Sequence, residues 1–148
     1  MAVDTRKTPP ARDFRLPSSR GREIRLNDYR HRQSVVLFFI PDAGDASARQ
    51  RLREFAAEYG AYQNWDAEVL AVIDGTPVQA EQLAEALDLP FPVLADEEGK
   101  VWGEYVGRLR YAAIFVLDRY TALQQSEVAE RAADLMSPGE ALEWVKYA

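Results

Sequence analysis

Blocks of apolar and polar residues along the chain predict a mixture of strands and helices. Residues 35–40 and 69–73 are continuously apolar, and a proline or an Asp-Gly pair ends each run. Continuous apolar runs of this length are typical of central strands that are covered on both faces. Between them, apolar side chains recur at spacings of four and three along residues 46–62, which predicts an amphipathic helix. We therefore predict a right-handed β-α-β unit with parallel strands.

Further elements are predicted on both sides of this unit. Alternating residues flank 18–21 and predict an N-terminal β-hairpin. After the unit, the pattern predicts helices at 77–88, 101–106 and 138–147, a short apolar segment at 90–94, and antiparallel strands at 111–117 and 122–128. The predicted fold class is α/β. It has a central mixed sheet of four to five strands flanked by helices, with the hairpin added, and strand 111–117 antiparallel to the two central strands.

Length and hydropathy indicate a single folded unit. A chain of 148 residues that is 47% hydrophobic suits one domain, expected over residues 12–148 after a flexible lead-in at residues 1–11. No apolar stretch approaches the roughly 20 residues that a membrane span requires, and the first residues contain no apolar signal-peptide core. We expect no membrane association and a cytoplasmic location.

The charge is unevenly distributed along the chain. The net charge is −6, but residues 1–32 hold nine basic and four acidic side chains and so carry +5, whereas residues 33–148 carry −11. The arginines of the basic stretch alternate with apolar residues at strand spacing, which favours a solvated, salt-bridged edge. We therefore expect no nucleic-acid partner; a nucleic-acid or partner-tethering role for the basic stretch is the alternative.

The absence of cysteine excludes several classes of chemistry. The chain has no cysteine, so disulfides, thiolate metal sites and thiol nucleophiles are all excluded. His31 is the only histidine, and no Ser/His/Asp set is present. We expect no cofactor and no catalytic nucleophile.

Carboxylates gather where the two central strands end. Asp42 and Asp45 follow the first strand, and Asp74 follows the second. This edge of a parallel sheet is where ligands bind in open α/β folds, and carboxylates suit a hard cation such as Mg²⁺. A metal-dependent activity is thus one alternative. We favour helix capping by Asp42 and Asp45 and a turn at Asp74, and we expect no metal.

Four stretches in order resemble one family of proteins. They are Asp13-Phe14-Arg15-Leu16-Pro17 with Leu26-Asn27-Asp28-Tyr29, Val35-Val36-Leu37-Phe38-Phe39 running into Pro41, Leu89-Pro90-Phe91-Pro92-Val93-Leu94-Ala95-Asp96-Glu97-Glu98-Gly99, and Phe115-Val116-Leu117-Asp118. With these four stretches in this order, the chain resembles the thioredoxin-fold peroxiredoxins, in particular the alkyl hydroperoxide reductase/thiol-specific antioxidant group. The resemblance implies a thioredoxin-like fold and a peroxidase activity as an alternative function.

The residues that this resemblance would make catalytic are missing. In peroxiredoxins a Thr or Ser lies four residues after the proline, and the reactive cysteine lies seven residues after the proline. Counted from Pro41, these two places hold Asp45 and Ala48. The family's arginine would fall at Ala112. In the related thiol reductases with a Cys-x-x-Cys pair, the two cysteines would fall at Gly44 and Ser47.

The expected function follows from this loss. We expect a redox-inactive binding or scaffold protein that uses a remnant groove to dock a protein segment or a small neutral ligand. The groove residues would be Pro41, Asp42, Gly44, Asp45, Ser47 and Arg110. The resemblance also implies a possible homodimer through the loops at 41–47 and 107–111, with Trp102, Tyr105 and Tyr111 as aromatic contacts.

Overall fold

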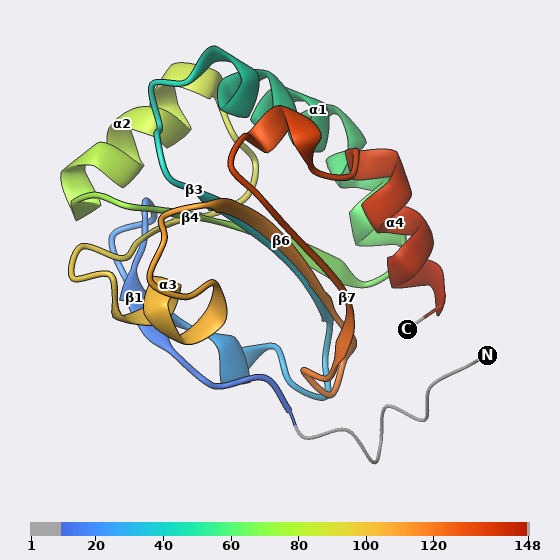
Figure 1. Ribbon diagram of the computed structural model, residues 1–148. Helices are drawn as coiled ribbons and strands as arrows, with labels where there is room; N and C mark the ends of the chain where they lie inside the picture. The colour runs from blue at the N-terminus through green and yellow to red at the C-terminus, as the bar shows by residue number, and fades with distance from the viewer. Residues whose placement is uncertain (1–9, 148) are drawn as a thin grey trace.

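Five strands form the central sheet of the computed structural model, which describes residues 10–147 (Figure 1). Their order across the sheet is β5-β4-β3-β6-β7, with bounds β3 Ser34–Ile40, β4 Ala67–Ile73, β5 Val93–Ala95, β6 Ala112–Leu117 and β7 Leu123–Ala129. Strands β3 and β4 are parallel, from Ser34 opposite Ala67 to Ile40 opposite Ile73, and β6 is antiparallel to β3. The predicted mixed sheet and the predicted pairing of its central strands are confirmed.

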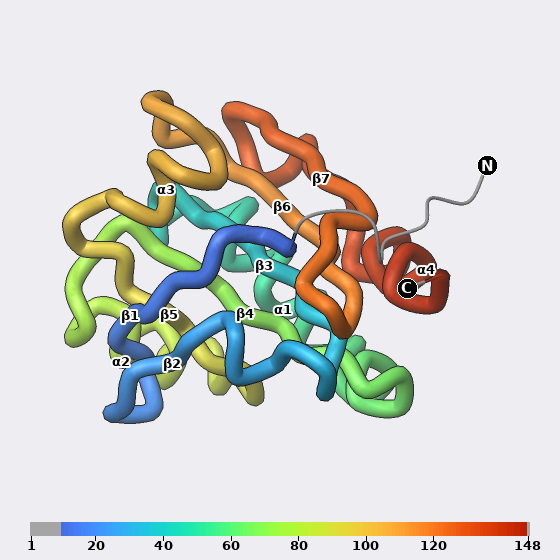
Figure 2. The backbone as a smooth tube through the Cα atoms, turned by 90° about the horizontal axis from the view of Figure 1, so that it is seen from below, coloured from blue at the N-terminus to red at the C-terminus, as the bar shows by residue number. Residues whose placement is uncertain are grey.

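Helices cover the sheet on both faces (Figures 1 and 2). Helices α1 (Ala46–Asn64), α2 (Pro77–Leu87) and α4 (Pro138–Tyr147) lie on one face, and α3 (Lys100–Tyr105) lies on the other with the hairpin. All seven residues of β3 are buried. Phe38 packs in the cluster under α1, and its neighbour Phe39 packs in the opposite cluster. This is why the run is apolar without alternation.

The N-terminal hairpin forms a small sheet of its own. Strands β1 (Arg15–Pro17) and β2 (Glu23–Arg25) pair antiparallel. Leu16 and Ile24 are buried against the face of the main sheet that α3 also covers. The amide of Ser19 donates to the carbonyl of Val93 at 2.8 Å, which ties the hairpin to β5. The predicted hairpin is therefore confirmed, and its strands are short.

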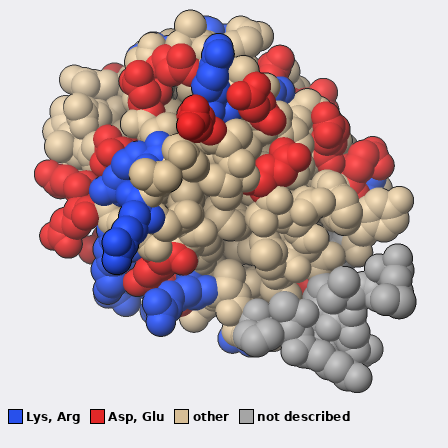
Figure 3. Space-filling view, viewed as in Figure 1, with Lys and Arg blue, Asp and Glu red and all other residues tan. Residues whose placement is uncertain are grey.

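Basic side chains gather on and near this hairpin, at the lower left of Figure 3, with acidic residues among them. Arg15 pairs with Glu23 at 3.5 Å, and Arg25 pairs with Asp13 at 3.2 Å. Both pairs are largely exposed, so each contributes little to stability. Within residues 10–32 these pairs agree with the interpretation of a salt-bridged edge, and the part of the basic stretch at residues 1–9 lies outside the described residues.

The position of Trp102 corrects one expectation from the sequence. Trp102 is completely buried, and its indole N–H donates to the carbonyl of Tyr111 at 3.2 Å. The prediction that Trp102 supplies contact area to a dimer interface is therefore wrong, while Tyr105 and Tyr111 are partly exposed.

Of the lead-in expected at residues 1–11, residues 1–9 lie outside the described residues. Within residues 10–147, no helix combines the length and the apolar character that a membrane crossing needs.

Candidate functional site

The turn between β3 and α1 is fixed by two aspartates. The carboxylate of Asp42 accepts the amide N–H of Gly44 at 2.9 Å, which closes a local turn. Asp45 is the N-cap of α1, and its carboxylate accepts the amide N–H of Ala48 at 3.0 Å. The hydroxyl of Ser47 donates to the same carboxylate. The predicted helix cap is confirmed for Asp45. It is wrong for Asp42, because the Gly44 amide that Asp42 accepts lies before the first residue of α1, so this carboxylate closes the preceding turn and not the helix.

These contacts lower the pKa of Asp45 and so favour the ionised form of its carboxyl. The Ser47 hydroxyl is the largest cause that lowers the pKa of the Asp45 carboxyl, and the Ala48 amide is the next. The positive charge of Arg131 lowers this pKa further. The start of α1 therefore carries a carboxylate that satisfies one of the free N–H groups of the first turn.

A small hollow opens beside the first turn of α1, and we call it the Ala48 hollow. Its volume is about 200 Å³, and its lining residues are Pro41, Asp42, Asp45, Ala48, Glu130, Arg131 and Ala132. Ala48 is only 2% exposed. Ala112 is buried in β6 within the same apolar cluster as Ala48. The structure thus brings Pro41, Asp45 and Ala48 together around one hollow.

A larger hollow lies on the other side of the same loop, and we call it the Arg49 hollow. Its volume is about 420 Å³. It lies between the loop after β3, the end of β4 and helix α2. Its lining residues are Pro41, Asp42, Ala43, Gly44, Arg49, Ile73, Asp74, Gln79, Gln82, Leu83 and Ala86.

The groove expected from the sequence is divided between these hollows. Pro41 and Asp42 line both. Ser47 lines neither hollow, and its hydroxyl donates to Asp45. Arg110 also lines neither: its guanidinium lies 3.6 Å from the carboxylate of Asp74 and 5.6 Å from the centre of the Trp102 ring. Arg110 therefore supports the rim of the Arg49 hollow.

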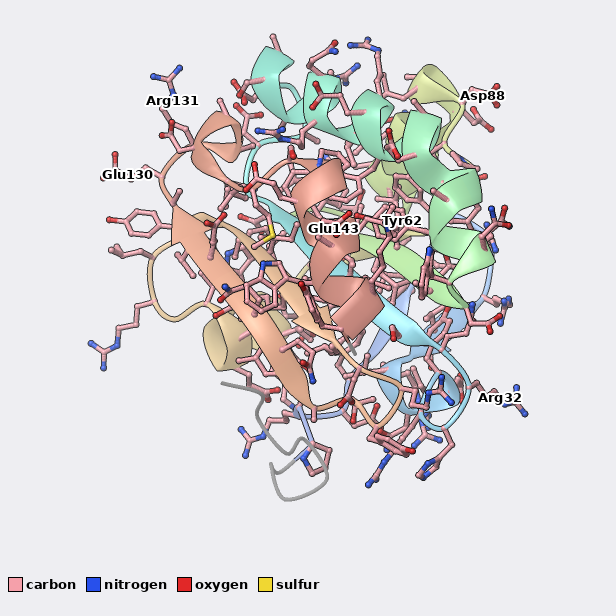
Figure 4. All side chains as sticks on the ribbon, turned by 90° about the vertical axis from the view of Figure 1, so that its right-hand side faces the viewer. Arg32, Tyr62, Asp88, Glu130, Arg131 and Glu143 are labelled. Carbon is pink, nitrogen blue, oxygen red and sulfur yellow. The ribbon has the colours of Figure 1, made fainter. Side chains whose placement is uncertain are left out.

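Three charged lining residues were missed from the sequence: Arg49, Glu130 and Arg131. Arg49 follows Ala48 in α1, and an arginine in an amphipathic helix is expected on the solvent-facing side, so the sequence does not single it out. Glu130 and Arg131 follow β7, and Figure 4 labels both there. Their separation from Asp45 along the chain leaves no local signal, because only the packing of β7 beside β6 brings them to this site.

The three carboxylates of the metal alternative are not gathered at one point. Asp42 shares the Arg49 hollow with Asp74 and the Ala48 hollow with Asp45, but neither of these two hollows is lined by all three carboxylates. Among residues 10–147, no three His, Asp or Glu side chains are grouped so that they could hold a metal ion. His31 lies in the exposed turn before β3, at the opposite end of that strand from Pro41. The described geometry gives the metal alternative no support.

Comparisons with known proteins agree with the fold. The AhpC/TSA family matches residues 8–126. A Mycobacterium tuberculosis protein named as a peroxiredoxin is 29% identical over 116 residues, which are 75% of this chain and 73% of the relative. Peroxiredoxin Q of Sedum lineare is 28% identical over 123 residues, which are 79% of this chain and 64% of that protein.

Solved structures show the same architecture. Peroxidoxin BcpB from Mycobacterium tuberculosis has a TM-score of 0.81 at 21% identity, covering 94% of this chain and 95% of that one. The Xanthomonas campestris bacterioferritin comigratory protein has a TM-score of 0.77 at 16% identity, covering 90% of each chain. The fold is therefore the thioredoxin-like fold of the peroxiredoxins, with the hairpin at its N-terminus.

Proposed function

The chain belongs to the AhpC/TSA family and has no cysteine, and from this we propose that it is a redox-inactive member that works as a binding protein. The observation that carries the proposal is the Ala48 hollow. Counted from Pro41, the family's reactive cysteine falls at Ala48, a residue with no heteroatom in its side chain.

The chemistry of peroxide reduction has no donor at this site. A thiolate must attack the O–O bond and become a sulfenic acid, which a thiol partner then reduces. The methyl group of Ala48 has no electron pair to offer. The hydroxyl of Ser47 donates to Asp45, and an alcohol does not pass through a sulfenic acid.

The charges of the Ala48 hollow also argue against an anionic ligand. Asp42, Asp45 and Glu130 line it against the single positive charge of Arg131. The N–H of Ala48, which a ligand would otherwise find at the start of the helix, is bonded to Asp45. These features favour a neutral or cationic group at this position.

The surface around the loop is nevertheless well suited to binding. Its backbone is fixed by the Asp42 turn and by the Asp45 cap, and it is flanked by two hollows. A rigid surface loses little conformational freedom when a ligand binds, so it supports affinity without further contacts. We propose that this surface docks a protein segment or a small neutral ligand without converting it.

The direct test is a pair of redox assays on the purified chain. Hydrogen peroxide consumption is followed with thioredoxin or dithiothreitol as reductant, and insulin reduction is measured beside it. We expect both rates to equal those of a protein-free blank. A rate clearly above the blank that persists with a metal chelator would overturn the proposal.

A further inference from the structure

The Arg49 hollow holds charges of both signs that do not neutralise each other. Arg49 and Asp42 both line it, yet no ion pair within 4.0 Å joins them. Among residues 10–147, Arg49 forms no ion pair with any other carboxylate either. Two opposite charges that line one hollow without pairing favour a ligand that carries the complementary pair.

Arg49 is held in place with part of its donor set free. Its side chain is partly buried, and its Nε–H donates to the carbonyl oxygen of Ala43 at 2.8 Å. This bond fixes the plane of the guanidinium, and no described residue accepts a hydrogen bond from its two Nη groups. A fixed guanidinium with free N–H groups matches the two oxygens of a carboxylate.

The carboxylates of the hollow supply the complementary half. Asp42 Oδ1 accepts the amide of Gly44, and Oδ2 has no hydrogen bond from the described residues. Asp74 is held at the rim by Arg110, with 3.6 Å between Nε and Oδ2. An ammonium group carries three donors and no acceptor, so it is a suitable partner for these oxygens.

The rest of the lining suits the body of a small molecule. Gln79 and Gln82 add amide groups, and the Oε1 of Gln79 already accepts the amide of Thr76 at 2.8 Å, which leaves its NH₂ as a donor. Ile73 and Leu83 provide an apolar floor. The volume of about 420 Å³ falls within the range of small-molecule sites, roughly 300–1,000 Å³.

We infer that the Arg49 hollow binds a small zwitterion of the α-amino acid class. The carboxylate of the ligand lies on Arg49, its ammonium group on Asp42 and Asp74, and its side chain against Leu83. This inference rests on the proposed function, because it names the ligand of a binding protein. Such a ligand carries no net charge, as the proposed function expects.

Calorimetric titration of the full chain with L-leucine, L-glutamine and L-serine tests the ligand class. N-acetyl-L-leucine, which lacks the ammonium group, and L-leucinamide, which lacks the carboxylate, serve as matched probes. We expect saturable binding of at least one free amino acid and, for leucine, at least about tenfold weaker binding of each blocked form. An absence of saturable binding up to about 10 mM, or equal binding of a blocked form, would overturn the inference.

Three variants locate the binding. Arg49→Met and Asp42→Asn are expected to weaken it at least about tenfold, whereas Arg53→Met, a change of an exposed arginine on the same helix, leaves it unchanged. Asp42→Asn keeps an oxygen for the Gly44 amide, so it remains informative if Arg49→Met does not fold. Binding that survives both changes contradicts the site. Peroxide turnover would refute the proposed function separately, since that assay does not depend on amino acid binding.

Discussion

Replacement of Asp45 tests whether the start of α1 is a capped helix terminus. The carboxylate accepts the amide of Ala48 at 3.0 Å and the hydroxyl of Ser47, so Asp45→Ala removes both acceptors at once. Asp45→Thr and Asp45→Asn each keep a side-chain oxygen that an N-cap residue can use. The three variants therefore separate the loss of the hydrogen bonds from the loss of the negative charge.

The magnitude follows from the geometry of the cap. Replacement of an N-cap aspartate by alanine costs about 1 kcal/mol of folding free energy. In a chain of this length, about 1 kcal/mol lowers the midpoint of thermal unfolding by about 2–4 °C. We expect this loss for Asp45→Ala at neutral pH and a smaller loss for Asp45→Thr and Asp45→Asn.

The pH dependence has a definite sign. The pKa of Asp45 is lowered in the folded state, chiefly by the Ser47 hydroxyl, so the charged cap stabilises the fold above the unfolded value of about 4. This contribution is lost as the pH falls through the folded pKa. The difference between the wild type and Asp45→Asn is therefore expected to stay constant from about pH 5 to 8 and to close below about pH 4.

Thermal unfolding followed by circular dichroism measures both effects. Glu81→Ala, at an exposed position of α2, is the matched control and is expected to leave the midpoint within about 1 °C. An Asp45→Ala protein as stable as the wild type would refute the capping argument. Equal losses for Asp45→Ala and Asp45→Thr would refute it as well.

Three further predictions concern the core, a buried acid and association. Tyr62→Phe removes the buried hydroxyl that donates to the carbonyl of Pro138 at 2.7 Å, so denaturant unfolding is expected to show a loss of about 1 kcal/mol. Tyr147→Phe, at an 80% exposed position, is expected to show none. Burial is the largest cause that raises the pKa of Glu68, so its charged form destabilises the fold above that pKa. Glu68→Gln keeps an acceptor for the Tyr59 hydroxyl and is expected to raise the unfolding midpoint at pH 7 by an amount that vanishes in acid. A midpoint that falls at pH 7 would contradict this. The homodimer remains a prediction: sedimentation at high micromolar concentration is expected to show a species heavier than the 16.7 kDa chain, and its absence would remove the prediction.

The central sheet was predictable because burial on both faces leaves a direct mark in the sequence. Residues 35–40 and 69–73 are apolar without interruption, and the structure buries both runs completely. The burial of Trp102 left no such mark. Its ring lies 5.1 Å from that of Phe39, a contact between distant segments that depends on how α3 packs on the sheet.

The candidate site was predictable where its residues follow one another along the chain. Pro41, Asp45 and Ala48 lie on one loop and the first turn of one helix, so their spacing alone brings them together. The position of Arg110 depends on a contact with Asp74 that the sequence does not indicate. Arg131 lines the Ala48 hollow through the packing of β7 beside β6, which no local pattern in the sequence indicates.

The central claim is that the start of α1 is a peroxide-reducing site without its thiol. The most direct test of this claim restores the thiol. The measurement is the rate constant for oxidation by hydrogen peroxide of the single thiol in Ala48→Cys with Asp45→Thr, compared with Ala57→Cys at an exposed position of the same helix. Asp45→Thr removes one of the three carboxylates of the Ala48 hollow, so the helix N-terminus and Arg131 then act on the thiol against Asp42 and Glu130 alone. We predict oxidation faster than in the control, still slowed by these two carboxylates and by Ala112 at the place of the family's arginine. A rate equal to that of Ala57→Cys would contradict the account.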